Sequence, residues 1–275
     1  MLAVMEGTLA PPESEAPAAD FPGLGEILRA GTRVTRANAG LLFGLWAACG
    51  LPREILRFAA VAATGVGDND ALQKAFDAGD WSVMGPFSAV GVLGMALGLL
   101  GYAATISVAA RAHQGRASEV GEALRAGAGR AIAVFLTSVL TAAAAMLGGL
   151  LLVLPGLYVL VRLSPALCAC VVEGAGARAA VSRSWKLTSG RFWTVGGFIS
   201  AFVAIAFFAA LALFIGGEIL DWAASPGGAA GDLLVRCAMS AGQFLISAWV
   251  TACLVELYFE LAAFAPRPAA EIPTE

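Results

Sequence analysis

Between Ala39 and Phe264 the chain alternates long apolar stretches with short polar gaps. An α-helix needs about 20 apolar residues to cross the hydrocarbon core of a bilayer. Stretches of about this length, the fourth of them shorter, lie at Ala39–Ala63, Pro86–Ala110, Ala131–Leu154, Leu157–Val172, Phe192–Leu220 and Leu233–Phe264. The pattern predicts an all-α, polytopic membrane protein with about six transmembrane helices, arranged as three hairpins.

The first stretch is the least regular, because Pro52 and the charged residues Arg53, Glu54 and Arg57 fall in its second half. Proline removes a backbone donor and tends to break a helix. Two courses are therefore open. One is a single span through Pro52, and the other is a short span that ends near Pro52 and is followed by an interfacial helix.

The composition agrees with a membrane protein and excludes a soluble one. Hydrophobic residues make up 59% of the chain, charged residues 13%, and the mean hydropathy is +0.80. Soluble domains carry about 25% charged residues. We expect a membrane domain over residues 23–264, flanked by disordered cytoplasmic tails over residues 1–22 and 265–275. The first 20 residues lack the basic start of a removable signal peptide.

Basic residues gather in alternate gaps, which predicts the orientation. They precede the first span, separate the second from the third, and separate the fourth from the fifth: Arg29, Arg33, Arg36, Arg111, Arg116, Arg125, Arg130, Arg178, Arg183, Lys186 and Arg191. In the other gaps the only basic residue is Lys74. By the positive-inside rule both termini are cytoplasmic, in a multi-pass protein of the bacterial cytoplasmic (inner) membrane.

A short motif recurs before the spans. Gly25–Gly31 reads Gly-Glu-Ile-Leu-Arg-Ala-Gly, and Gly121–Gly127 reads Gly-Glu-Ala-Leu-Arg-Ala-Gly. A looser third copy places Trp185 and Lys186 at the Leu-Arg positions. We expect three units, each a cytoplasmic amphipathic helix followed by a transmembrane hairpin. Chance similarity between alanine-rich helices is the alternative.

The helix before the first span has a basic face. Arg29, Arg33 and Arg36 follow one another at i, i+4 and i+7, so they share one side of a helix. Such a helix lies at the membrane surface and attracts anionic lipid headgroups. The same arginines would also be present if they served only to fix the orientation.

Residues 154–193 carry a resemblance to a known family. They contain Pro155-Gly156, Val172-Glu173-Gly174 and a segment from Ala179 through Arg183-Ser184-Trp185 to Phe192-Trp193. This resembles the bacterial glycerophosphoryl diester phosphodiesterase membrane-domain family, in which a Pro-Gly turn is followed by similar segments. The resemblance implies six spans. In some relatives the membrane module precedes a catalytic barrel with two histidines, but this chain has one histidine, so that chemistry is not expected here.

Arg162 is the most unusual residue of the predicted spans, because it lies inside the short fourth one. An arginine at the centre of a span costs about 2.5–3.5 kcal/mol on insertion scales, so it normally faces a partner or water. It could bind a lipid phosphate or line a polar cavity. The alternative is a structural ion pair, or an arginine that reaches toward the outer interface.

The sixth span carries a polar stripe at helical spacing, formed by Arg236, Ser240, Gln243, Ser247 and Thr251. These residues could line a substrate path, or they could join helices by hydrogen bonds. Near the inner end of this span, Glu256 and Glu260 could pair with Arg183, Lys186 or Arg191. The second span carries a seam of glycines that would let another helix approach closely: Gly91, Gly94, Gly98 and Gly101.

No group of residues predicts an enzyme, a cofactor or a metal site. His113 is the only histidine, and the five cysteines are scattered through apolar segments. We therefore expect a non-enzymatic membrane protein that interacts with lipids or docks a partner. The expected partners are membrane lipids, with anionic headgroups among them. A protein partner or a second copy is a further possibility, and no nucleic acid is expected. The alternative is a transporter or channel for a small solute or lipid that uses Arg162, the polar stripe and Arg53/Glu54/Arg57. Candidate lipid-phosphate or polar-cavity residues are Arg162, Arg183, Lys186, Arg191, Gln243, Glu256 and Glu260.

Overall fold

A computed structural model describes residues 21–66, 69–151, 153–224 and 228–264, and the regular structure of these residues is entirely helical. The helices are α1 (Leu24–Ala37), α2 (Ala39–Thr64), α3 (Asn69–Asp77), α4 (Trp81–His113), α5 (Val120–Leu151), α6 (Val153–Leu163), α7 (Ala166–Val172), α8 (Ala177–Leu187), α9 (Phe192–Ala224) and α10 (Gly228–Ala263). The predicted tails fall outside the described residues at 1–20 and 265–275. Phe21 is described, and it packs against Phe198 and Phe264.

Six helical segments of the described chain are long and apolar enough to cross a membrane, which confirms the predicted multi-pass membrane protein. They are Ala39–Thr64, Trp81–His113, Val120–Leu150, Leu154–Val172, Phe192–Leu220 and Leu233–Ala263. The fourth comprises α6 and α7, which are separated by a break at Ser164 and Pro165. Large apolar side chains such as Leu150, Leu154 and Ile132 are exposed, as lipid-facing residues are.

The first span continues through Pro52 as one helix, so the alternative of a short span followed by an interfacial helix is wrong. α2 is helical from Ala39 to Thr64, with Pro52 inside it. The turn before Pro52 is reinforced by packing, because the indole of Trp46 lies over Gly50 so closely that a Cβ there would be 2.6 Å from it. The charged residues after Pro52 are consequently held on the same helix as the apolar residues before it.

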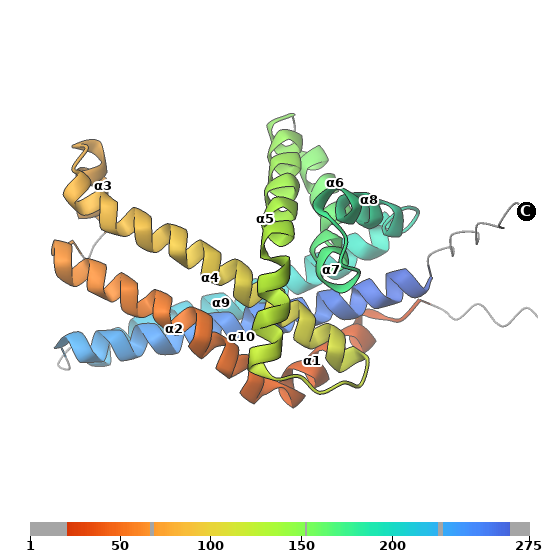
Figure 1. Cartoon of the computed structure of the whole chain (residues 1–275), viewed down its shortest axis with the longest axis horizontal. Coiled ribbons are helices and arrows are strands. Elements are labelled where there is room, and N and C mark those ends of the chain that lie inside the picture. The colour runs from red at the N-terminus through yellow and green to blue at the C-terminus, as the bar shows by residue number, and fades with distance from the viewer. Residues whose placement is uncertain (1–20, 67–68, 152, 225–227, 265–275) are drawn as a thin grey trace, which may run out of the picture.

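The long helices follow two directions (Figure 1). α2, α4, α9 and α10 extend along the long axis of the molecule, and α10 packs against the other three. α5 packs across α4 and then rises away from these four with α6 beside it. Glycines permit this pairing, since a Cβ on Gly148 would be 2.9 Å from Gly156 Cα. The resemblance described above suggested a turn at Pro155-Gly156, but both residues belong to α6.

The helices before the spans differ from the prediction in one copy. The first motif copy lies in α1, which Asn38 separates from α2, and the third lies in α8, which residues 188–191 separate from α9. The second copy, Gly121–Gly127, is continuous with the apolar part of α5. The prediction of a separate helix before each hairpin is thus wrong for this unit, because the helix continues through Gly127 and Gly129 without a break.

Two of the four seam glycines of α4 face α2. A Cβ on Gly94 would be 3.1 Å from Arg53 Cδ, and one on Gly101 would be 3.5 Å from Cys49 Cβ. A Cβ on Gly91 or Gly98 would have no described atom within 4 Å, so the seam is only partly covered by α2.

Candidate functional site

The polar stripe of α10 faces a cavity between α2, α4 and α10. This polar cavity has a volume of about 260 Å³. Its polar lining comes from all three helices: Arg53, Tyr102, Thr105, Ser240, Gln243, Ser247 and Thr251. Apolar and small residues complete the wall, among them Trp46, Gly98 and Phe244. Gln243 lies about 15 Å along α10 from Leu233, so the cavity is well inside the span.

A second hollow continues from the polar cavity between α2, α9 and α10. This arginine pocket has a volume of about 400 Å³, and it shares Arg53, Ser240 and Gln243 with the polar cavity. Its charged residues are Arg53, Glu54, Arg57, Glu218 and Arg236. Three guanidinium groups and two carboxylates give the lining a net positive charge, which favours an anion.

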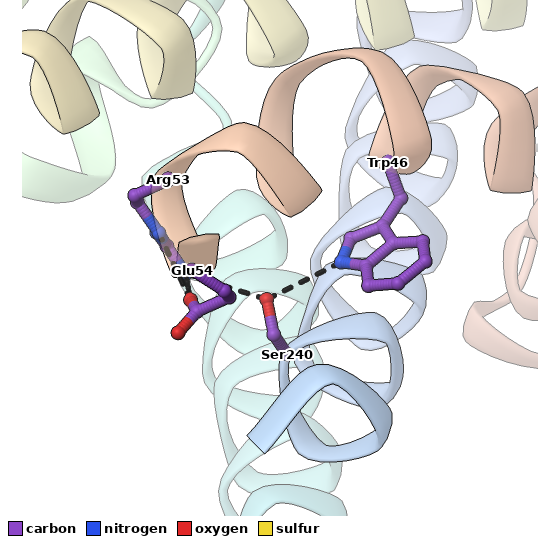
Figure 2. A network of polar contacts seen from close by, with 4 residues as sticks. All are labelled: Trp46, Arg53, Glu54 and Ser240. Carbon is purple, nitrogen blue, oxygen red and sulfur yellow. Dashed lines mark hydrogen bonds and ion pairs between the residues drawn. The ribbon is translucent and has the colours of Figure 1, made fainter. Parts of the chain in front are cut away.

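Ser240 lines both hollows. It also belongs to a network of polar contacts with residues of α2 (Figure 2). Its hydroxyl oxygen accepts a hydrogen bond from Trp46 Nε1 at 3.2 Å and one from Arg53 Nη2 at 3.5 Å. Arg53 also pairs with Glu54, with 2.8 Å between Nη2 and Oε1. The Glu54 side chain is buried and the Arg53 side chain is 47% exposed. The guanidinium of Arg53 is therefore anchored on one side and open on the other.

Of the remaining stripe residues, Thr251 bonds to Tyr102 of α4, whereas Arg236 and Gln243 join α10 to no other described helix. Thr251 donates to the Ser247 carbonyl of its own helix at 2.7 Å. The amide of Gln243 forms no hydrogen bond to any described residue. Among the described residues, Arg57 and Arg236 likewise form no ion pair. A stripe that served only to hold helices together would use these groups in interhelical bonds.

Arg162 lies elsewhere, between α6 and α8. Its guanidinium contacts the faces of Tyr158 and Trp185, with 5.3 Å and 4.9 Å from Cζ to the ring centroids. It donates to the Tyr158 hydroxyl at 2.8 Å and to the Trp185 carbonyl at 3.1 Å. Ser184 in turn donates to the Arg162 carbonyl at 2.7 Å. Arg162 thus binds α6 to α8 and does not line either hollow of the candidate site.

Glu256, near the end of α10, has a different partner from those that we expected. Glu256 is buried, and its Oε2 lies 2.7 Å from His113 Nδ1. The His113 ring stacks on Phe259 with 4.2 Å between centroids. No ion pair joins Glu256 or Glu260 to Arg183, Lys186 or Arg191 within the described chain.

The basic residues of the predicted site are also dispersed. Arg183 pairs with Glu173, with 2.9 Å between Nε and Oε1, and the Tyr258 hydroxyl donates to the same carboxylate. Arg183 lies outside the spans, and although burial acts against its charged form, the bond to Glu173 raises the pKa of its guanidinium. Arg191 lies over the rings of Phe21 and Phe264. Lys186 is exposed. Of the seven predicted site residues, only Gln243 lines the polar cavity.

Sequence reasoning missed several cavity residues. Trp46, Tyr102 and Thr105 are single polar or aromatic residues in apolar helices, and Glu218 is the only charged residue of Phe192–Leu220. None of them belongs to a periodic pattern. Only the contacts between helices bring them together with the stripe.

Comparison with known proteins gives a family without an established activity. A family model described as a domain of unknown function (DUF7847) matches residues 23–261, and the chain belongs to this family. The resemblance to the glycerophosphoryl diester phosphodiesterase membrane-domain family is wrong, because the match is to DUF7847 and no model of that family matches. No curated protein and no solved structure matches the chain.

Proposed function

We propose that this chain is a non-enzymatic membrane protein that binds a small molecule with an anionic group inside its membrane domain. The polar part of the molecule would occupy the polar cavity, and its anionic group would face Arg53, Arg57 and Arg236. One observation carries the proposal: Arg236 and Gln243 of the α10 stripe line the two hollows and form no ion pair or hydrogen bond with a described residue of a neighbouring helix. Unpaired polar groups inside a membrane domain are costly unless water or a ligand satisfies them.

The guanidinium groups determine the class of molecule. Arginine binds phosphate and carboxylate through two parallel hydrogen bonds, and it stays charged in proteins. The pocket that holds these groups is bordered by apolar residues such as Leu213, Phe214 and Val235. A molecule with an anionic head and an apolar part, such as a lipid or a lipid precursor, satisfies both kinds of lining.

Transport of the same molecule is a second candidate function. The stripe extends from Arg236 to Thr251, and its residues line one hollow or the other along that length. At 1.5 Å per residue this is about 22 Å, most of the roughly 30 Å of a hydrocarbon core. A path of that length favours passage through the domain over binding at one surface.

The proposal includes the setting predicted from the sequence. The spans would form three hairpins in the bacterial cytoplasmic membrane, with both termini cytoplasmic, because the arginines of alternate gaps support this orientation. Membrane lipids would be its main partners. A second copy or another protein is a further possible partner, and nucleic acid is not expected.

Native mass spectrometry of the gently purified protein tests the proposal. We expect a small molecule to remain bound to the wild type, and at least tenfold less of it to remain on Gln243→Leu and Arg57→Gln. The matched controls are Gln73→Leu in α3 and Arg125→Gln in α5, which remove the same groups from exposed positions outside both hollows. A wild type that retains nothing, or equal losses in the controls, would contradict the proposal. Uptake into proteoliposomes then separates transport from binding alone.

A further inference from the structure

A third hollow, with a positively charged lining, lies on α1 and shares no residue with the polar cavity. It is shallow, has a volume of about 680 Å³, and is lined by Leu28, Arg29, Thr32, Arg33, Arg36 and Ala37. The three arginines are exposed, and none of them forms an ion pair with a described residue. Arg29 Nε donates to the Gly25 carbonyl at 2.9 Å, which leaves its two terminal amino groups available. We call this surface the α1 basic hollow.

An apolar groove lies beside it between α9 and α10. Its volume is about 310 Å³, and it is lined by Ile205, Ala206, Ala209, Leu245, Ile246 and Trp249. The groove contains no charged residue. Two small residues of α9, Ala206 and Ala209, line it between larger apolar side chains. We call it the α9–α10 groove.

One hydrogen bond joins the two surfaces. Trp249 lines the α9–α10 groove, and its Nε1 donates to Oγ1 of Thr32 at 3.0 Å. Thr32 in turn lines the α1 basic hollow. The position of α1 is fixed by close packing, since a Cβ on Gly31 would be 3.0 Å from the Cys253 backbone nitrogen. The basic and apolar surfaces are therefore held next to each other.

We infer that these two surfaces form one binding site for an anionic phospholipid. The phosphate of the headgroup would lie on Arg29, Arg33 and Arg36, which match its charge and can bind its oxygens in pairs. An acyl chain would lie in the α9–α10 groove, past Trp249, whose amphipathic ring suits the level between headgroup and chain. The apolar groove selects a lipid over free phosphate. This site does not depend on the function proposed for the polar cavity.

Lipid competition on the wild type is the first test. The protein is purified in detergent and mixed with equal amounts of phosphatidylglycerol and phosphatidylcholine that carry the same acyl chains. Native mass spectrometry should show at least tenfold more bound phosphatidylglycerol, and excess soluble glycerol phosphate should displace little of it. Equal retention of the two lipids would overturn the proposal without any variant. Displacement by glycerol phosphate would identify a site for free anions instead.

Two variants then locate the lipid. Replacing Arg29, Arg33 and Arg36 by glutamine should remove the preference for phosphatidylglycerol. Ala209→Phe fills the groove and should lower retention of both lipids. The control replaces Arg116, Arg125 and Arg178 by glutamine, which removes the same charge from other exposed positions. If this control loses the preference to the same extent, general attraction to basic loops explains the binding and the proposed site is wrong. Gln73→Leu, which lies in α3 outside all of these hollows, should leave the preference unchanged.

Discussion

At the scale of single residues, two arginines, Arg53 and Arg162, differ in how their surroundings use them. Arg53 bonds to Ser240 and Glu54 on one side and is open on the other. Arg162 is enclosed by two aromatic rings and by acceptors on α6 and α8. Its neighbours use its hydrogen-bonding capacity, so little remains for a ligand. We therefore attribute binding to Arg53 and a structural role to Arg162.

Replacing Arg162 should reduce stability without affecting the polar cavity. Hydrogen bonds to charged groups contribute about 1.5–3 kcal/mol each to stability, and a cation–π contact about 0.5–2 kcal/mol. We expect Arg162→Ala to lower the free energy of unfolding by roughly 2–4 kcal/mol, because several such contacts are lost and not all are fully buried. Thermal unfolding in detergent measures this.

Arg162→Lys provides the control for this prediction. Lysine keeps the charge but not the planar group that contacts both rings, so only part of the stability should return. Retention of the small molecule by folded Arg162→Ala should equal that of the wild type. Selective loss of the molecule from a fully stable variant would show that Arg162 binds it.

At the scale of elements, close approach of helices depends on a few glycines. Gly31 of α1 faces Cys253 of α10, where a Cβ would overlap Sγ and lie 3.0 Å from the backbone nitrogen. Gly31→Ala should therefore destabilise the protein by about 1–3 kcal/mol, as overpacking does. Gly25→Ala is the control, because a Cβ there has only the end of the Arg29 side chain near it, at 3.8 Å. Thermal unfolding of both variants checks the difference.

A double variant makes this prediction sharper. Combining Gly31→Ala with Cys253→Ala removes the contact to Sγ but not the contact to the backbone. Recovery should therefore be partial. Complete recovery would mean that the helices can move apart at little cost, and that α1 is less firmly placed than the α1 basic hollow requires.

The start of α4 provides a pH-dependent element. Asp80 precedes the span, and its Oδ1 accepts hydrogen bonds from Ser82 N at 3.0 Å and Ser82 Oγ at 2.6 Å. These bonds hold the pKa of the Asp80 carboxyl below its usual value. Since the folded pKa is the lower one, the stabilisation is present above about pH 4 and is lost as the pH falls through the lowered value.

Comparison of the wild type with Asp80→Ala tests this dependence. The wild type should unfold at a higher temperature at pH 6, and the difference should shrink below about pH 4 as the carboxyl takes up a proton. A difference that is the same at both pH values would show that the charge of Asp80 does not matter to the start of α4.

The elements were more predictable than the site. The spans of α9 and α10 follow from long apolar runs, since a helix satisfies its backbone groups in lipid within one segment. The separate course of α1 follows from Asn38, whereas α5 has no such break and was predicted wrongly. The polar cavity needs contacts among helices distant in sequence, such as that of Trp46 with Ser240, and no single-helix pattern contains them.

At the scale of the whole molecule, the three motif copies pack in the same way. α1 crosses α10 at Gly31, and the start of α5 crosses α4 at Gly127, where a Cβ would be 3.0 Å from the Leu100 carbonyl oxygen. α8 bonds to α6 through Ser184. Each opening helix thus packs on the last part of the preceding unit, and α1 packs on the last unit of all. The positions that correspond in the three copies are buried in each: Ile27, Ala123 and Ser184, and Gly31, Gly127 and Thr188.

This shared packing supports a true repeat over chance similarity. Alanine-rich helices that resembled one another by accident would have no reason to bury the same two positions. The repeat also requires the same side of the membrane for all three opening helices, because each begins a hairpin that crosses twice. α1, the start of α5 and α8 should therefore all lie on the cytoplasmic side, and the loop before α4 on the opposite side.

Cysteine labelling tests this orientation of the whole chain. Gln73 in α3 and Ser189 after α8 are both exposed and lie outside the spans, so a cysteine at either place is accessible to a reagent on its own side. The five native cysteines lie within spans, four of them buried, which keeps their reaction low. A membrane-impermeant maleimide should label Gln73→Cys in intact spheroplasts, and it should label Ser189→Cys only after the membrane is opened. The reverse pattern would place the α1 basic hollow on the outer face, and labelling of both variants in intact spheroplasts would show that the three units do not share one orientation.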